Sequence, residues 1–96
     1  MKIGIPKEIK DKEARVGMTP SGVSQLIKAG HSVVVETNAG LDSGFSNEQY
    51  TNAGANLSSA QDAWQVDLVV KVKEPQKSEY HYLQKQIVFT FFHLAG

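Results

Sequence analysis

Two uninterrupted apolar runs constrain the fold of this chain more than any other feature of its sequence. Three consecutive valines stand within residues 32–37, and Ile-Val-Phe stands within residues 87–92. Half-exposed strands alternate apolar and polar residues, whereas continuous runs of this kind are typical of strands covered on both faces. Residues 2–6 and 67–73 are two further apolar segments of strand length. The sequence therefore predicts four strands, in a sheet with a layer on each side.

Helical signals separate these four segments. Thr19 followed by Pro20 predicts a helix start, and Gly30 predicts the end of that helix. Ser46 and Gln49 have the spacing of a capping box. Three more helices are expected at residues 46–53, 59–65 and 78–84. This alternation predicts an α/β fold, in which helices flank a parallel sheet joined by right-handed crossovers, as in Rossmann-like and flavodoxin-like folds.

Length and composition limit the class of protein. The chain has 96 residues, enough for one domain over residues 1–96. Its ten acidic and ten basic residues offer no basic stripe for nucleic acid and no polybasic patch for a membrane. The absence of cysteine excludes disulfides and thiolate metal sites. Because no apolar run is long enough for a signal peptide or a bilayer span, we expect a soluble, cytoplasmic domain.

Three cationic or titratable side chains follow the predicted strands. Arg15 stands in the loop after the first strand, Lys73 at the end of the third, and His93 at the end of the fourth. Ligands of open parallel sheets bind at the carboxyl ends of the strands, so these side chains are expected to share one edge. Lys71 lies on the same face as Lys73, but only Lys73 is expected to reach the rim.

Each of these residues also has a plain structural interpretation. An arginine in a loop is usually a solvated charge, and a lysine in a strand often guards an exposed sheet edge. A histidine after an apolar strand can simply donate to a backbone carbonyl. Their shared location favours a site over these alternatives. His31 and His81 lack that support and are expected at the surface.

The chemistry of the three residues predicts a ligand. A guanidinium binds a carboxylate through two parallel hydrogen bonds, an ammonium polarises an adjacent oxygen, and an imidazole moves a proton near neutral pH. A 2-oxo or 2-amino acid fits these three groups. The histidines have no metal-ligand spacing, so no metal is expected. The chain also lacks G-x-G-x-x-G, so no dinucleotide site is expected within it.

Four segments in order resemble one family. The segments "IGIPKEIKDKEARVGMTPSGV", "GHSVVVETNAGLDSGFSNEQYTNAGA", "LVVKVKEP" and "FTFFHLA" are similar to the N-terminal, substrate-binding domain of the alanine dehydrogenase and pyridine nucleotide transhydrogenase family. The resemblance covers nearly the whole chain. It implies an oxidoreductase that converts L-alanine to pyruvate and ammonia with NAD. Later segments of the family's domain would cover part of its sheet, so here the apolar run within residues 87–92 is expected to be left partly uncovered and to make copies of the chain self-associate as a homo-oligomer.

The resemblance also assigns roles to the residues. Arg15 and Lys73 match the family's substrate-binding residues, and His93 matches its acid/base catalyst. NAD would be bound by a domain that follows this segment, so residues 1–96 would form an incomplete substrate domain, inactive alone. Two alternatives stay open: the nucleotide-binding subunit of a proton-translocating transhydrogenase, and a stand-alone module that binds a small carboxylate. Saccharopine dehydrogenases, which share the fold more distantly, rank third.

Overall fold

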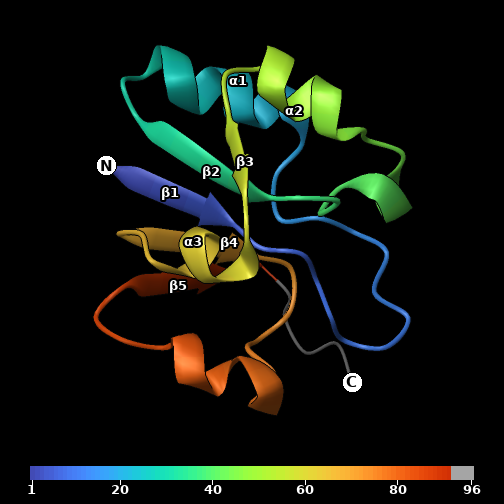
Figure 1. The fold of residues 1–96 in the computed structure, drawn as a ribbon, viewed down its shortest axis with the longest axis vertical. Coiled ribbons are helices and arrows are strands. Elements are labelled where there is room, and N and C mark those ends of the chain that lie inside the picture. The colour runs from blue at the N-terminus through green and yellow to red at the C-terminus, as the bar shows by residue number, and fades with distance from the viewer. Residues whose placement is uncertain (92–96) are drawn as a thin grey trace.

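One sheet of parallel strands organises residues 1–91, the part of the chain that the structure, a computed structural model, describes. Within these residues it has five strands in the order β3–β2–β1–β4–β5 (Figure 1). They are β1 (Lys2–Ile5), β2 (Ser32–Glu36), β3 (Asn56–Ser58), β4 (Leu68–Lys71) and β5 (Ile87–Thr90). Every neighbouring pair is parallel. The predicted α/β class with a parallel sheet is confirmed.

The strand β3 is the one that the sequence pattern does not predict. It is three residues long, and Leu57 is its only apolar residue. It forms by pairing with β2, where Val35 lies opposite Leu57 and Glu36 opposite Ser58. A segment with so little intrinsic strand preference depends on its neighbour in the sheet, which local patterns do not reveal.

The helices begin and end at the predicted signals. The hydroxyl of Thr19 accepts a hydrogen bond from the Gly22 amide at 3.1 Å, and Gly30 has a φ of 96° after the helix. Ser46 and Gln49 form both bonds of the capping box. The helices are α1 (Pro20–Lys28), α2 (Asn47–Asn52) and α3 (Ala60–Trp64), with 3-10 turns η1 (Leu41–Ser43) and η2 (Lys77–Tyr82). The expected helix at residues 78–84 is therefore a 3-10 turn, and η1 is an addition.

The parallel register divides the side chains of the sheet between two layers. Ile3 of β1 lies opposite Val33 of β2, so both side chains point to the same face. That face packs against Val23 of α1 and Tyr50 of α2 in the main hydrophobic core. In Figure 1, α1 and α2 lie together, and β5 is the strand furthest from them. The other face carries α3, which contacts β1 and β2.

The apolar face of β5 is largely exposed, which confirms the expectation that this apolar run is left partly uncovered in residues 1–91. Ile87 is 64% exposed, Phe89 54% and Phe91 44%. Ile87 lies opposite Leu68, and Phe89 lies opposite Val70, so the β5 side chains continue the face that α1 and α2 cover elsewhere. Those two helices pack over the other end of the sheet, so this end stays open.

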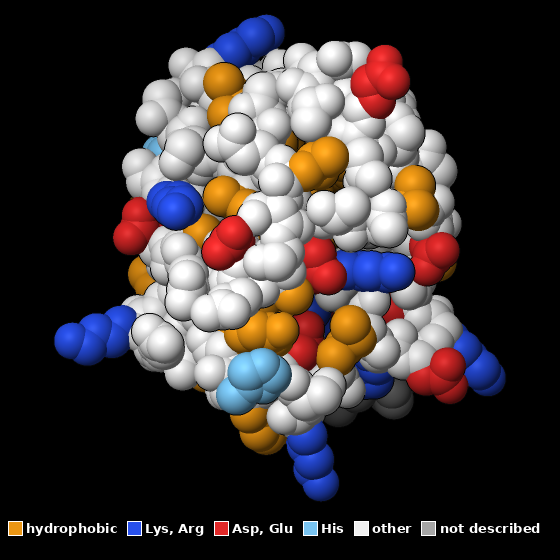
Figure 2. All heavy atoms as spheres, in the orientation of Figure 1, with side chains coloured by type: hydrophobic (Ala, Val, Ile, Leu, Met, Phe, Trp, Pro, Cys, Tyr) orange, Lys and Arg blue, Asp and Glu red, His pale blue; other side chains and the backbone are white. Residues whose placement is uncertain are grey.

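Charges of both signs are interspersed on the surface shown in Figure 2, with small apolar patches between them. This mixture agrees with the equal numbers of acidic and basic residues in the sequence. Among residues 1–91, none of the helices has the length and apolar character needed to cross a membrane.

Gly4 allows α3 to approach the sheet closely. A Cβ atom at Gly4 would lie 1.8 Å from the backbone oxygen of Ala63 and 2.9 Å from Cγ2 of Val66. The first of these neighbours is backbone, which cannot rotate away. The absence of a side chain at Gly4 therefore determines how α3 packs on β1 and β2.

We expect Gly4→Ala to destabilise the fold by about 3 kcal/mol or more, because an overpacked site whose neighbour is backbone has to shift a whole element. Gly30→Ala is the matched control, since nothing lies within 4 Å of its Cβ position and only the positive φ opposes it. That control should cost about 1–2 kcal/mol. Urea unfolding of the two variants measures both; equal losses would contradict the close-packing argument.

Candidate functional site

The loop after β1 folds over the carboxyl end of β4. Gly17 of this loop lies so close to β4 that a Cβ atom there would be 2.3 Å from the backbone oxygen of Val70. Further back in the loop, a carboxylate oxygen of Glu8 accepts the Val72 amide at 3.0 Å, and the other accepts the Lys73 amide at 3.2 Å. The first and third predicted strand ends are therefore joined directly, as the topology predicts.

Lys71 is buried beneath this junction. Its ammonium Nζ lies 3.1 Å from Oε1 of Glu8 and 3.6 Å from Oε2 of Glu79, and all three side chains are at most 4% exposed. The ring centroid of Trp64 lies 6.0 Å from the same nitrogen. Because β4 lies between β1 and β5, it is not an edge strand, and the alternative interpretation of Lys73 as an edge-strand guard is wrong. Lys71 pairs with the buried carboxylates of Glu8 and Glu79, behind the predicted site.

Burial affects the carboxyl of Glu79 within this cluster. Burial raises the pKa of its carboxyl, and the hydrogen bond from the Gln76 amide and the ammonium of Lys71 oppose that effect only in part. The Gln76 amide donates to Oε1 of Glu79 at 2.9 Å, which anchors the η2 turn. One lysine faces two carboxylates here, so a proton on Glu79 brings the cluster towards neutrality.

The two predicted cations at the rim meet at one carboxylate, Glu13. The guanidinium of Arg15 donates from Nε to Oε2 and from Nη2 to Oε1, both at 3.0 Å. Nζ of Lys73 lies 3.8 Å from Oε1 of the same carboxylate. The hydrogen bonds from Arg15, with the charges of Arg15 and Lys73, hold the pKa of Glu13 below its usual value against the effect of burial.

The structure places the remaining predicted residues as follows. Lys73 lies two residues beyond the end of β4, and its side chain is 16% exposed. Glu74 is on the surface, where it pairs with Lys10 at 2.9 Å. His81 is exposed, whereas His31 is half-buried and its buried Nδ1 has no hydrogen-bond partner within residues 1–91. His93 lies outside the described residues.

Three acidic residues of this region were missed by the sequence analysis: Glu8, Glu13 and Glu79. A signal was present for the first and third, because a lysine at the centre of an apolar strand requires carboxylate partners when buried. Glu13 has no such signal, since its setting in "KDKEAR" looks like a solvated charge run. Among the described residues, no group of three or more acidic or histidine side chains could hold a metal ion.

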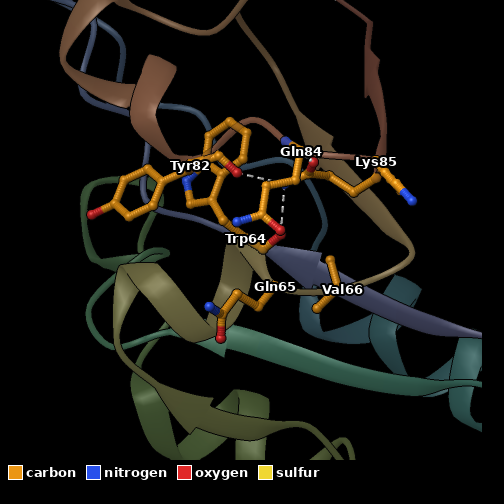
Figure 3. A pocket seen from close by; sticks show the side chains of 7 residues that line it. Trp64, Gln65, Val66, Tyr82, Gln84 and Lys85 are labelled. Carbon is orange, nitrogen blue, oxygen red and sulfur yellow. Dashed lines mark hydrogen bonds between the residues drawn. The ribbon is translucent and has the colours of Figure 1, made fainter.

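A hollow lies at the opposite edge of the sheet. It has a volume of about 320 Å³ and is lined by Trp64, Gln65, Val66, Tyr82, Gln84, Lys85 and Gln86 (Figure 3). These residues precede β4 and β5, so the hollow lies at the amino ends of the strands. The side-chain Nε2 of Gln86 donates to the backbone oxygens of Trp64 and Tyr82, both at 2.8 Å, and thereby joins the two residues whose rings stack. These hydrogen bonds hold the segments before β4 and β5 together. Arg15 and Lys73 lie at the other edge, beyond the carboxyl ends of the strands.

Comparison with known proteins decides the family. The family model for the alanine dehydrogenase/PNT N-terminal domain matches residues 4–96. This chain belongs to that family. It is 56% identical over its full length to alanine dehydrogenases of Staphylococcus epidermidis and Bacillus subtilis. The chain covers 26% of each of these relatives, so it spans about a quarter of their length.

Two solved structures of the family confirm the fold. An L-alanine dehydrogenase superposes with a TM-score of 0.93 at 53% identity, over 97% of this chain and 26% of that one. A transhydrogenase from Sinorhizobium meliloti superposes with a TM-score of 0.87 at 34% identity, over 92% of this chain and 26% of that one. Alanine dehydrogenase is the better match of the two, which confirms the predicted resemblance.

The opposite pKa shifts of Glu79 and Glu13 predict opposite effects of pH. Glu79 has a raised pKa in the folded state, so its contribution to stability is present at acidic pH and is lost as the pH rises through that pKa. Glu79→Gln cannot ionise, and its free energy of unfolding relative to the unsubstituted chain should rise from about pH 4 to pH 7.

Glu13→Gln is the matched control, for which the opposite change of stability with pH is expected. The pKa of Glu13 is lowered, so its contribution is present above the ordinary carboxyl pKa of about 4.3 and is lost on acidification. Its variant should therefore lose stability at neutral pH and approach the unsubstituted chain in acid. Urea unfolding at several pH values measures both slopes, and parallel slopes would refute the assignment.

Proposed function

We propose that this chain is the substrate-binding part of an NAD-dependent alanine dehydrogenase, which interconverts L-alanine and pyruvate plus ammonia. The observation that carries the proposal is the meeting of Arg15 and Lys73 at one carboxylate, at the carboxyl ends of β1 and β4. The names of the 56% identical relatives support it. Because the chain spans a quarter of those relatives, the activity is that of a longer protein.

The two cations can bind one end of the substrate. The guanidinium of Arg15 suits a carboxylate, which it holds by paired hydrogen bonds. Lys73 follows β4 closely and can contact the oxygen or nitrogen at C2, where an ammonium stabilises developing negative charge. His93 is proposed to give a proton to, or take one from, the C2 oxygen. This last role rests on the resemblance, since His93 is outside the described residues.

NAD would be the hydride acceptor of this reaction. The residues of this chain do not fit a dinucleotide site. The glycines of the loop after β2 serve other purposes: Gly44 ends η1 with a φ of 86°, and a Cβ at Gly40 would meet the ring of Tyr50 at 2.6 Å. Neither belongs to a G-x-G-x-x-G pattern. We propose that a domain outside this chain binds the cofactor, and that the protein is cytoplasmic.

The transhydrogenase subunit is the second candidate. The structural match at 34% identity and a TM-score of 0.87 favours it. It predicts no turnover of alanine, because a transhydrogenase moves hydride between nucleotides and needs no substrate carboxylate site. The stand-alone binding module predicts carboxylate binding without any redox chemistry. An alanine assay separates both from the first proposal.

The test is a chimera in which residues 1–96 replace the matching segment of the Bacillus subtilis alanine dehydrogenase. We expect alanine turnover in the chimera and none in the isolated chain, because hydride transfer needs the nicotinamide held against the substrate. Arg15→Ala in the chimera should raise KM for pyruvate about 10- to 100-fold, the size of one lost hydrogen bond between charged groups.

Lys10→Ala is the matched control for Arg15→Ala. It removes a cation from the same loop whose ammonium pairs with exposed Glu74, and it leaves the Lys10 carbonyl that accepts the Glu13 amide in place. Its KM should equal that of the unsubstituted chimera. A chimera that folds and binds NAD yet turns over no alanine would contradict the proposed function, and equal KM changes in the two variants would contradict the role of Arg15.

We also propose that copies of this chain associate through β5. Within residues 1–91, β5 is the outermost strand of the sheet and its outer backbone edge is unpaired. Ile87, Phe89 and Phe91 are exposed beside this edge. Two identical edge strands can pair antiparallel about a twofold axis, which brings these three side chains together with the same three of the other copy. A standard interface needs about 800 Å² per partner.

Phe89→Lys should therefore shift the isolated chain from dimer to monomer. Leu41→Lys is the control, because Leu41 is a similarly exposed apolar residue, at 51%, in the η1 turn. Light scattering over a dilution series measures the mass of each variant. A monomeric mass for the unsubstituted chain at high concentration would rule out the association.

A further inference from the structure

Glu13 holds Arg15 by one edge of its guanidinium. Nε and Nη2 of Arg15 each donate to a different oxygen of the Glu13 carboxylate at 3.0 Å, and the Arg15 backbone amide donates to Oε2 at 2.7 Å. The Glu13 side chain is 4% exposed, whereas that of Arg15 is 64% exposed. The carboxylate is therefore the fixed partner, and the guanidinium is carried outward on it.

The other edge of the guanidinium remains available for a ligand. A guanidinium has five N–H donors in a plane, and Glu13 uses the lateral pair on Nε and Nη2. In residues 1–91, Nη1 of Arg15 has no hydrogen-bond partner. The terminal edge formed by Nη1 and Nη2 can thus hold a second carboxylate in the same paired geometry.

The loop itself is built to hold Glu13 in this position. The Glu13 amide donates to the Lys10 carbonyl at 3.1 Å, in a turn where Lys12 has a φ of 65°. A left-handed φ at a non-glycine residue carries a cost, so the surrounding contacts must maintain it. The hydroxyl of Ser43 donates to the carbonyl of Ala14, the residue after Glu13, at 2.5 Å.

Glu13 lies between the two cations of the rim. Its carboxylate is 3.0 Å from Nη2 of Arg15 and 3.8 Å from Nζ of Lys73. Without Glu13, the two cations would repel each other, and the flexible Arg15 side chain would have no fixed orientation.

We infer that Glu13 is a positioning residue, which orients the terminal edge of the Arg15 guanidinium toward the substrate carboxylate and keeps Lys73 beside it. This inference rests on the proposed function. Glu13 contacts no substrate in this arrangement and acts through Arg15. Removing its charge weakens carboxylate binding in the ground state and the transition state alike, so KM changes more than kcat.

The experiment uses the chimera described above, with pyruvate as the varied substrate. Glu13→Gln should raise KM for pyruvate about 10-fold, the size of one lost charge-assisted hydrogen bond, with a smaller change in kcat. Asp11→Asn is the matched control, because Asp11 is an exposed acid of the same loop, and its KM should stay unchanged. In an Arg15→Ala background, Glu13→Gln should add no further increase, because the two act as a unit.

Three results would overturn the inference while leaving the proposed function intact. They are an unchanged KM in Glu13→Gln, a lowered KM, which would make Glu13 an internal competitor for Arg15, and an equal increase in the Arg15→Ala background. An inactive chimera would instead contradict the proposed function. The inference is then decided by NMR of the 96-residue chain. The Arg15 Nε–H signal should exchange slowly with water and exchange faster in Glu13→Gln, and equal exchange rates would refute the positioning.

Discussion

The buried carboxylate of Glu8 is the interaction on which the candidate site depends. It accepts the amides of Val72 and Lys73 and pairs with the ammonium of Lys71, so one side chain of the β1 loop holds the whole carboxyl end of β4. A buried carboxylate without such partners would be strongly unfavourable. The loop after β1 and the end of β4 must therefore adopt this arrangement together, and the positions of Arg15 and Lys73 follow from it.

The acidic and basic residues of this edge form two layers with different tasks. The inner layer, Lys71 with Glu8 and Glu79, is shielded from water and supports the backbone. The outer layer, Arg15 and Lys73 around Glu13, lies at the rim, where the Arg15 side chain is 64% exposed. Because a buried ion pair contributes little to stability when weighed against desolvation, the inner layer is better explained by its effect on geometry than by a gain in free energy.

Much of the fold could be predicted from local signals. The caps at Thr19 and Ser46, the glycine after α1 and the apolar runs of four strands each act over a few residues, and the structure has them where the sequence places them. The failures have a common cause. The strand β3 forms through pairing with β2, and the 3-10 turn η2, where a helix was expected, is tied to β4 through Glu79 and Lys71. Both depend on contacts between separate elements of the fold.

The sequence alone determined the parallel α/β order and, by the strand-end rule, predicted that Arg15, Lys73 and His93 share one edge of the sheet. His93 stays a prediction, since it lies beyond residue 91. Only the tertiary structure decided which carboxylates join the lysines: Glu8 is more than sixty residues from Lys71, and Glu13 lies in what looks like a solvated charge run. The physical reason is that ion pairing depends on distance in space and on burial. Neither quantity is defined until the loop after β1 has closed over β4.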